Sequence, residues 1–277
     1  MPKKVLITGA ASGIGLATAV RLDRLGFEVW GTYLTEEELA RAEGQTGEAV
    51  RWLPLDLRDG ESVRRAAAAL GEGGLFGLVN NAGVDIPGPL EFLPLDRLRE
   101  QLEVNVVGQL AVTQACLPLL RRAGGRIVFI GSIDGKAVTP FQGAYGTSKH
   151  ALEALADILR MELSPWGIWV SVIEPGDIAT PIWAKSLALA ETMLGRLPQR
   201  AHELYGPLMA TALATAKKMA GRAKPPDTVA RAVAHALTSA RPRARYMVGA
   251  DARLRYLLEI LPVRWRDRLI LGFIKRG

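Results

Sequence analysis

The chain is poor in cysteine and histidine. One of its 277 residues is a cysteine, Cys116, so an intrachain disulfide is excluded. No other potential ligands stand around Cys116 at metal-binding spacing, and we expect no metal site. The interpretation that remains for Cys116 is a small buried apolar residue.

Long hydrophobic runs are also lacking. No run approaches the roughly 20 apolar residues that a membrane span requires. The N-terminus, MPKKVLITGA, leads directly into a strand-like stretch and leaves no room for a signal peptide. We therefore expect a cytoplasmic protein. Its 49% hydrophobic and 23% charged residues are typical of a globular fold.

Charge of one sign is missing from most of the chain. The net charge is +7, but from Arg241 onward ten Lys/Arg face three Asp/Glu, which accounts for the whole surplus. The remainder is neutral and shows neither a basic face with stacking aromatics nor a recognition motif. We therefore expect no nucleic-acid partner.

Short apolar runs alternate with longer helical stretches along the chain. The strand-like runs cover 4–8, 27–33, 49–57, 75–83, 125–132, 167–176 and 244–249. This alternation predicts an α/β fold, a Rossmann-like doubly wound parallel sheet of about seven strands with helices on both faces. We expect one domain over 1–277, with a helical substrate lid at 181–225 and a tail at 250–277.

A glycine-rich turn follows the first expected strand. TGAASGIG (8–15) places Gly9, Gly13 and Gly15 where a strand gives way to a helix. Glycines allow positive φ angles there, and they let backbone amides approach a pyrophosphate at the helix N-terminus. In this strand–turn–helix context the pattern favours dinucleotide binding.

A phenol and an ammonium are paired further along, in YGTSK (145–149). On a helix Tyr145 and Lys149 are four residues apart and project from one face. A cation beside a phenol lowers the phenol's pKa, as proton transfer requires. Taken alone, the pair fits an ordinary exposed helix face better, because such pairs are common on helices.

Together with four further motifs, these stretches resemble the short-chain dehydrogenase/reductase family over about residues 3 to 181. The motifs occur in order as TGAASGIG, NNAG (80–83), VNVVG (104–108), GSIDG (131–135), YGTSK and EPGDIATP (174–181). The resemblance implies an NAD(P)-dependent alcohol dehydrogenase or carbonyl reductase. It is strongest for the branch that includes retinol and 17β-hydroxysteroid dehydrogenases.

The resemblance also implies the catalytic residues. Tyr145 is similar to the family's general acid/base, and Lys149 to the residue that lowers its pKa and binds the nicotinamide ribose. Ser132 corresponds to the hydroxyl that holds the substrate oxygen. Asn105 resembles the helix residue whose backbone holds a relay water, with a helix-kinking or capping role as the alternative.

Cofactor contacts follow from the same resemblance. Asp56 is similar to the acid that accepts the adenine amino group, and Asn80 to a structural asparagine. The implied contacts are Gly9, Ser12, Gly13, Ile14, Gly15, Tyr33, Leu34, Asp56, Leu57, Asn81, Ala82, Gly83, Tyr145, Lys149, Pro175, Gly176, Ile178 and Thr180.

The choice between NAD and NADP depends on the end of the second strand. Tyr33 and Leu34 stand there, so neither the acid that favours NAD nor the arginine that favours NADP is present. Glu36 and Glu37 follow closely and would repel a 2′-phosphate. We expect NAD, with NADP as the alternative.

The family resemblance does not fix the substrate. The expected lid is rich in Leu, Ala, Met and Trp. This composition suits a lipophilic ligand such as a steroid, retinoid or long-chain alcohol. Packing onto the domain core explains the same composition. An NADPH-dependent ketoreductase of lipid or polyketide synthesis and a nucleotide-sensing non-enzyme are the rival interpretations. Asp134 departs from the small residue usual in the family, without an evident role.

The tail alternates apolar residues with arginines, which predicts a C-terminal amphipathic helix. Such a helix can lie in a bilayer interface as a peripheral membrane contact, or fold onto the pocket or a second subunit. The resemblance further implies a homodimer or homotetramer through the helices near 96–122 and 149–163.

Overall fold

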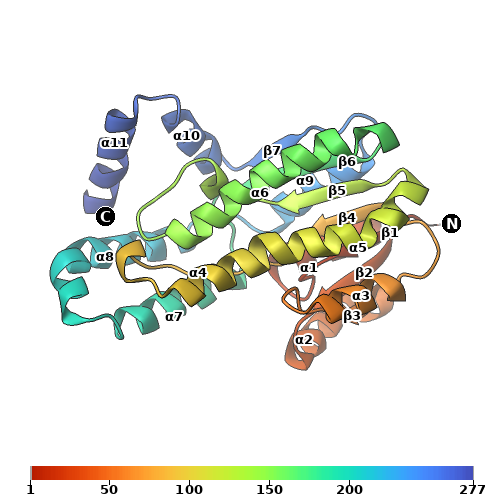
Figure 1. The fold of residues 1–277 in the computed structure, drawn as a ribbon, viewed down its shortest axis with the longest axis horizontal. Coiled ribbons are helices and arrows are strands. Elements are labelled where there is room, and N and C mark those ends of the chain that lie inside the picture. The colour runs from red at the N-terminus through yellow and green to blue at the C-terminus, as the bar shows by residue number, and fades with distance from the viewer. Residues whose placement is uncertain (1, 277) are drawn as a thin grey trace.

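The computed structural model of the protein describes residues 2–276 and is built on one seven-stranded parallel sheet (Figure 1). The strand order is β3-β2-β1-β4-β5-β6-β7. The strands are β1 (Lys4–Ile7), β2 (Glu28–Tyr33), β3 (Val50–Pro54), β4 (Gly77–Asn80), β5 (Arg126–Ile130), β6 (Trp169–Pro175) and β7 (Arg245–Val248). This confirms the predicted Rossmann-like fold.

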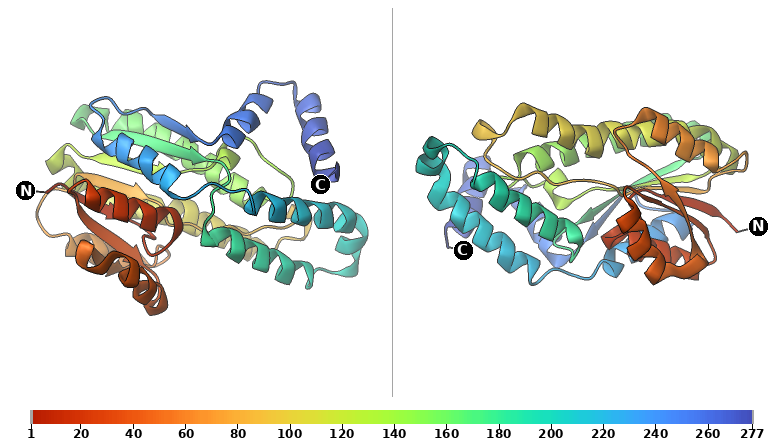
Figure 2. Two further views of the ribbon diagram at one scale, coloured as in Figure 1. Left: turned by 180° about the vertical axis from the view of Figure 1, so that it is seen from behind. Right: turned by 90° about the horizontal axis from the view of Figure 1, so that it is seen from below.

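Helices cover both faces of the sheet, as the right-hand view of Figure 2 makes plain. One face packs on α1 (Gly13–Arg24) and α9 (Asp227–Thr238), with α2 (Glu36–Thr46) beside β2 and β3. The other packs on α3 (Gly60–Ala69), α5 (Gly108–Ala123) and α6 (Gly143–Glu162). Burial on both faces explains why the central strands are continuously apolar. Cys116 is fully buried in this second core.

The sheet reverses its winding between β1 and β4, and ligands of such sheets bind beyond the carboxyl ends of the strands at that point. The glycine turn leaves β1 there, and the residues after β4 and β5 converge on it. Short 3₁₀ turns connect other elements: η1 (Gly47–Ala49), η2 (Leu90–Phe92), η4 (Ile133–Gly135) and η5 (Ser164–Trp166).

The long helix expected at about 96–122 is not continuous. It consists of α4 (Leu95–Leu102), a π-helical turn at Glu103–Val107, and α5. Asn105 lies in the π turn, fully buried, with its side-chain amide bonded to the backbone of Val84. Such turns accommodate one extra residue without ending the helix, and apolar periodicity does not reveal them.

The region expected to be a lid forms α7 (Pro181–Leu194) and α8 (Gln199–Ala220), which extend beyond the sheet (Figure 1). The tail, expected as one helix, is two: α10 (Ala250–Leu258) and α11 (Val263–Arg276). Pro262 precedes α11 and cannot donate a helical hydrogen bond, so the chain turns there. As a result α11 packs against α8. Within residues 2–276 no helix has the length and apolar content needed to cross a bilayer.

Candidate active site

A cavity of about 1100 Å³ extends across the carboxyl ends of the strands. Its inner end is lined by the glycine turn, the ends of β2 and β3 and the residues after β4. Its outer end is lined by α7, α8 and the two tail helices. Almost every residue that the resemblance implied for catalysis or cofactor binding lies on its wall. The two exceptions are buried: Gly15, inside the glycine turn, and Asn105, behind the segment that follows β4.

The glycine turn has the geometry of a phosphate cradle. Gly9 and Gly13 have φ angles of +62° and +54°, which favour glycine. A Cβ at Gly9 would lie 3.0 Å from Cα of Ala82, and one at Gly15 only 2.3 Å from the carbonyl oxygen of Gly9. Ser12 precedes α1 without a side-chain cap bond in the described structure, so the first amides of that helix are available to an anion. The residues present therefore fit a dinucleotide pyrophosphate.

Ser132, Tyr145 and Lys149 meet at the centre of the cavity. Ser132 caps η4 directly after β5, while Tyr145 and Lys149 lie one turn apart on α6. The Lys149 ammonium donates to the carbonyl oxygen of Ile130 at 2.8 Å and lies 5.5 Å from the Tyr145 ring centroid. The structure thus brings the three together facing one cleft.

Electrostatics at this cluster differ from the expectation in one respect. Burial raises the pKa of Tyr145, with the nearby Asp134 and Asp85 adding to the rise, whereas hydrogen bonding with Ser132 lowers it. Burial also lowers the pKa of Lys149 to about 8. In the chain alone, burial therefore gives Tyr145 a raised pKa, whereas the sequence suggested that Lys149 would lower it.

Asn105 braces the segment after β4 through its side chain. Its Oδ1 accepts from the amide of Val84 at 2.9 Å, and its Nδ2 donates to the carbonyl of Val84 and to Ser148 Oγ, each at 3.0 Å. Ser148 is adjacent to Lys149 on α6. The side chain of Asn105 thus ties the π turn to the helix that carries the central cluster.

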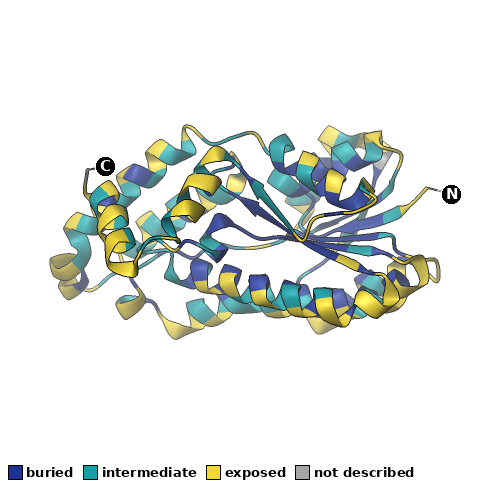
Figure 3. Ribbon diagram, turned by 90° about the horizontal axis from the view of Figure 1, so that it is seen from above, coloured by how far each residue is buried: buried dark blue, intermediate teal, exposed yellow. Residues whose placement is uncertain are grey.

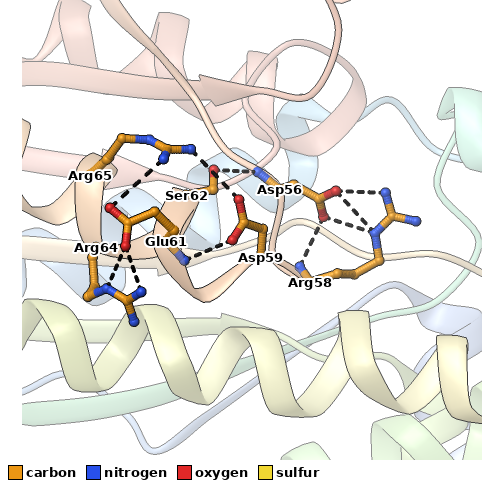
Figure 4. A network of polar contacts seen from close by, with 7 residues as sticks. All are labelled: Asp56, Arg58, Asp59, Glu61, Ser62, Arg64 and Arg65. Atoms are coloured by element: carbon orange, nitrogen blue, oxygen red, sulfur yellow. Dashed lines mark hydrogen bonds and ion pairs between the residues drawn. The ribbon is translucent and has the colours of Figure 1, made fainter.

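At the end of the cavity where the resemblance implies adenosine (the adenosine end), the lining includes Tyr33, Leu34, Asp56 and Leu57. The carboxylate of Asp56 accepts from the guanidinium of Arg58, at 2.7 Å for the shortest contact, and Figure 4 shows the two side chains facing each other. That hydrogen bonding holds the pKa of Asp56 below its usual value.

The loop after β6 forms another wall of the cavity. The amide of Gly176 donates to the carbonyl of Val248 at 3.0 Å, which anchors the loop to β7. A Cβ at Gly176 would lie 1.8 Å from an Asp251 carboxylate oxygen, so a larger residue there would displace the Asp251 side chain. Ile178 is buried, and Thr180 precedes the first turn of α7.

Sequence reasoning missed several polar residues of the cavity. The Asp85 carboxylate accepts from Ser186 Oγ of α7 at 2.7 Å, while its Oδ1 is buried without a hydrogen-bond partner in the described structure. Burial raises the pKa of Asp85 to about 6. Glu38 lines the adenosine end and accepts from the amide of Leu34 at 3.2 Å. The only sequence signal for Asp85 is its place directly after NNAGV.

Comparison with known proteins agrees with this geometry. The model of the short chain dehydrogenase family matches residues 3–189, so the chain belongs to the short-chain dehydrogenase family. Mouse retinol dehydrogenase 16 is 37% identical over 278 residues, covering 97% of this chain and 87% of that protein. Human 17-beta-hydroxysteroid dehydrogenase type 6 is 37% identical with the same coverage.

A solved short-chain dehydrogenase from Streptomyces avermitilis superimposes with a TM-score of 0.77 at 27% identity, covering 100% of this chain and 98% of that one. Family, fold and the cluster in the cavity together identify an NAD(P)-dependent oxidoreductase. The matches do not favour the ketoreductase or the nucleotide-sensing interpretation.

Proposed function

We propose that the protein transfers a hydride between a nicotinamide cofactor and a lipophilic alcohol or its carbonyl compound, with Ser132, Tyr145 and Lys149 as catalytic residues. The observation that carries this is the position of the three polar side chains in one cavity whose outer end is apolar. Its outer wall is lined by Leu187, Ala190, Met193, Leu194, Leu197, Met209, Leu213, Met219, Leu254, Leu258, Ile270 and Phe273.

In the mechanism, a bound dinucleotide supplies the hydride acceptor for oxidation and the hydride donor for reduction. In oxidation, Tyr145 removes the proton of the substrate hydroxyl; in reduction it returns that proton to the developing alkoxide. Ser132 would turn its single hydroxyl proton, which it donates to Asp134 Oδ2 at 3.3 Å in this structure, towards the same oxygen, where negative charge accumulates. Both hydroxyls would serve one substrate oxygen, because both residues line the cavity and their side chains lie close enough to hydrogen-bond with each other.

Lys149 stabilises ionised Tyr145 as long as its own amine is protonated. Its pKa is lowered to about 8 by burial, so this support is present below about pH 8 and is lost as the pH rises through that value. Asn105, through Ser148, holds the turn of α6 on which Lys149 lies. A water held by the backbone of Asn105 would complete a proton path to solvent.

The remaining cofactor contacts follow the cavity wall. The amides of Ser12, Gly13 and Ile14 would hold the pyrophosphate, since they open α1. The adenosine end would rest on Tyr33, Leu34, Asp56 and Leu57, and the nicotinamide on the segment from Pro175 to Thr180. Asn81, Ala82 and Gly83 would line the ribose between them.

For the cofactor we propose a preference for NAD over NADP. Glu38 supports it, because this carboxylate lies at the adenosine end beside Leu34 and would repel a 2′-phosphate. The ammonium of Lys185 lies 3.4 Å from the carboxylate of Glu38, so this lysine already has a partner other than a 2′-phosphate. Fluorescence titration should show tighter binding of NADH than of NADPH. Glu38→Gln should reduce the difference between the affinities for NADH and NADPH. If the unaltered chain bound NADPH more tightly than NADH, the preference would be refuted.

The substrate class is supported by the apolar cavity and by the relatives, which are retinol and 17-beta-hydroxysteroid dehydrogenases. The direct test is a screen of steroid, retinoid and long-chain alcohols with NAD and NADP, followed by absorbance of the reduced cofactor. Turnover of small polar alcohols alone would refute a lipophilic substrate.

For the assembly we propose a homodimer through α5 and α6. Ile158, Met161 and Trp166 are exposed apolar residues on or next to α6, beside a shallow groove between the two helices. Light scattering should report a dimer that Ile158→Glu dissociates. Leu25→Glu, at an exposed position at the end of α1, is the matched control. A monomeric wild-type chain would refute this assembly.

The exposed side of the tail also supports peripheral membrane contact. Ile260, Val263 and Trp265 are exposed, with Arg264 and Arg268 nearby. Pelleting with vesicles that contain anionic phospholipid should be strong for the full chain and weak for Trp265→Ser. Trp169→Ser, at another exposed tryptophan, is the control. Equal pelleting of all three would refute contact through the tail. Absence of pelleting for the full chain would equally refute this contact.

A further inference from the structure

The tail contributes a cation to the centre of the cavity. The guanidinium of Arg255, on α10, donates from one nitrogen to the carboxylate of Asp134 and to the carbonyl of Ala137, the latter at 2.7 Å. The side chains of Arg255 and Asp134 are only 20% and 16% exposed. An ion pair so enclosed, with its hydrogen bonds made, is costly to break by removing one partner.

Asp134 in turn contacts the catalytic serine. Ser132 Oγ donates to Asp134 Oδ2 at 3.3 Å, and the backbone amide of Asp134 donates to Ser132 Oγ at 3.1 Å. A continuous set of hydrogen bonds therefore runs from Arg255 through Asp134 to the hydroxyl of Ser132. The residues at its two ends come from opposite halves of the chain.

An apolar contact fixes α10 in the place that this connection needs. Ala252 is fully buried against Ile133 and Ala137, which are themselves buried, and Met247 packs on the same cluster. Arg255 follows Ala252 by three residues and so projects from the same side of the helix. The buried side of α10 thus holds the guanidinium over η4, the turn that Ser132 caps.

We propose that Asp134 and Arg255 are positioning residues that hold the Ser132 hydroxyl and balance charge around Tyr145, which makes α10 part of the catalytic centre. This inference rests on the proposed function of Ser132 and Tyr145.

The two charges act on the phenol in opposite directions. The negative charge of Asp134 raises the pKa of Tyr145, and the positive charge of Arg255 lowers it. Asp85 also raises it, and Lys149 faces the ring from the next turn of α6. Around Arg255, the other charged neighbours are Asp177 and Asp251. Losing either member of the pair leaves the other charge uncompensated beside the phenol.

The test measures kcat/KM for alcohol oxidation against pH in the full-length chain. With saturating NAD, the rising limb of this profile reports the deprotonation of the group that takes the alcohol proton, which we assign to Tyr145. Arg255→Met should move that limb upward by about half a pH unit or more and lower kcat/KM about tenfold. Asp134→Asn should move it downward. The double variant removes both charges and should return the limb towards its original pH.

Controls separate positioning from a merely structural role. Arg253→Met removes an exposed arginine of the same helix and should leave the pH profile unchanged. Arg255→Lys keeps the positive charge, so its rising limb should lie at the wild-type pH. Its kcat/KM should be only partly restored relative to Arg255→Met. NADH affinity and thermal unfolding check that each variant is folded. If Arg255→Met does not fold, Asp134→Asn and the double variant decide the test. The first should move the rising limb to lower pH, and the second should return it towards the wild-type pH.

The outcomes are distinct. In one, the wild-type chain turns over substrate while the rising limb lies at the same pH in all variants, or moves in the same direction in both single variants. Either result refutes the positioning role and leaves the proposed function intact. If the wild-type chain turns over no alcohol or ketone, the proposed function fails and this inference fails with it.

Discussion

The two ends of the cavity are built in different ways. At the inner end, where we propose that the cofactor binds (the cofactor end), the contacts around the glycine turn run mainly to backbone: Thr8 Oγ1 accepts from the amides of Asn81 and Ala82, and Asn81 donates to the carbonyls of Thr8 and Gly9. These contacts tie β1 to the segment after β4, and the strands around them are buried (Figure 3).

The substrate end is held instead by side-chain pairs between segments remote in sequence. Ser186 of α7 bonds Asp85, Arg255 of α10 bonds Asp134, and Lys224 after α8 lies 3.4 Å from Asp251. Each pair includes a carboxylate. The glycine turn at the cofactor end therefore depends on steric fit, whereas the substrate end depends on charge and, at Asp85, on pH.

The largest effect is expected where the two ends meet, at Tyr145. Tyr145→Phe removes the proton that both directions of the reaction need and should lower kcat by about a thousandfold. Affinity for NADH should stay within about twofold, because the ring remains. Tyr205→Phe, on α8 and outside the cavity lining, is the matched control and should keep full activity. Retained turnover in Tyr145→Phe would contradict the assigned proton donor.

The steric nature of the cofactor end is tested by Gly15→Ala. Its new Cβ would meet the Gly9 carbonyl oxygen at 2.3 Å and Asn81 Nδ2 at 2.6 Å, and the backbone there cannot move freely. We expect a loss of about 3 kcal/mol in the free energy of unfolding, together with weaker NADH binding. Chemical denaturation and fluorescence titration measure the two.

Gly44→Ala is the control for that substitution. Gly44 lies on α2, and a Cβ there would have nothing within 4 Å. Replacing a helical glycine in open space should stabilise the protein by about 0.5 kcal/mol. Equal effects at the two glycines would show that the turn at the cofactor end is not tightly fitted.

The charge dependence of the substrate end is tested by Asp85→Asn. The pKa of Asp85 is raised from 3.8 to about 6, so the folded chain binds a proton more readily than the unfolded one. Ionised Asp85 therefore costs stability, and the cost grows as the pH rises between about 4 and 6 and persists above.

Asp85→Asn keeps the hydrogen bond from Ser186 and removes the charge. It should raise the free energy of unfolding by about 2 kcal/mol at pH 7 and have little effect at pH 4. Asp59→Asn, at an exposed helix cap, is a control without this pH dependence. A gain at pH 7 equal to that at pH 4 would contradict the account.

The same contrast explains what the sequence could predict. Strand alternation and the glycine turn are local patterns with backbone consequences, so the sheet and the location of Gly9, Gly13 and Tyr145 followed from short stretches. The roles of Asp134 and Arg255 could not be predicted, because 121 positions separate the pair and only the packing of Ala252 brings them together.

Two local features also escaped prediction. The π turn around Asn105 keeps the apolar pattern of a regular helix, and its cause, the hydrogen bonds to Val84, lies about 20 residues away. Pro262 marked a break in the tail, but the pattern of leucines and arginines continued across it and indicated one helix.

The smallest expected effects concern the charged network after β3, where Figure 4 shows two ion pairs of similar geometry. Arg58 pairs with Asp56 and Arg64 with Glu61, at 2.7 and 2.6 Å. The Arg64–Glu61 pair is largely exposed and the Arg58–Asp56 pair is partly exposed, so Arg58→Met and Arg64→Met should each change the free energy of unfolding by less than about 1 kcal/mol. Only the first pair lines the cavity. Arg58→Met should therefore alter NADH affinity about threefold through Asp56, while Arg64→Met leaves it unchanged. If the two variants bound NADH equally well, Asp56 would not contact the cofactor, and the steric account of the cofactor end would need no charged group at all.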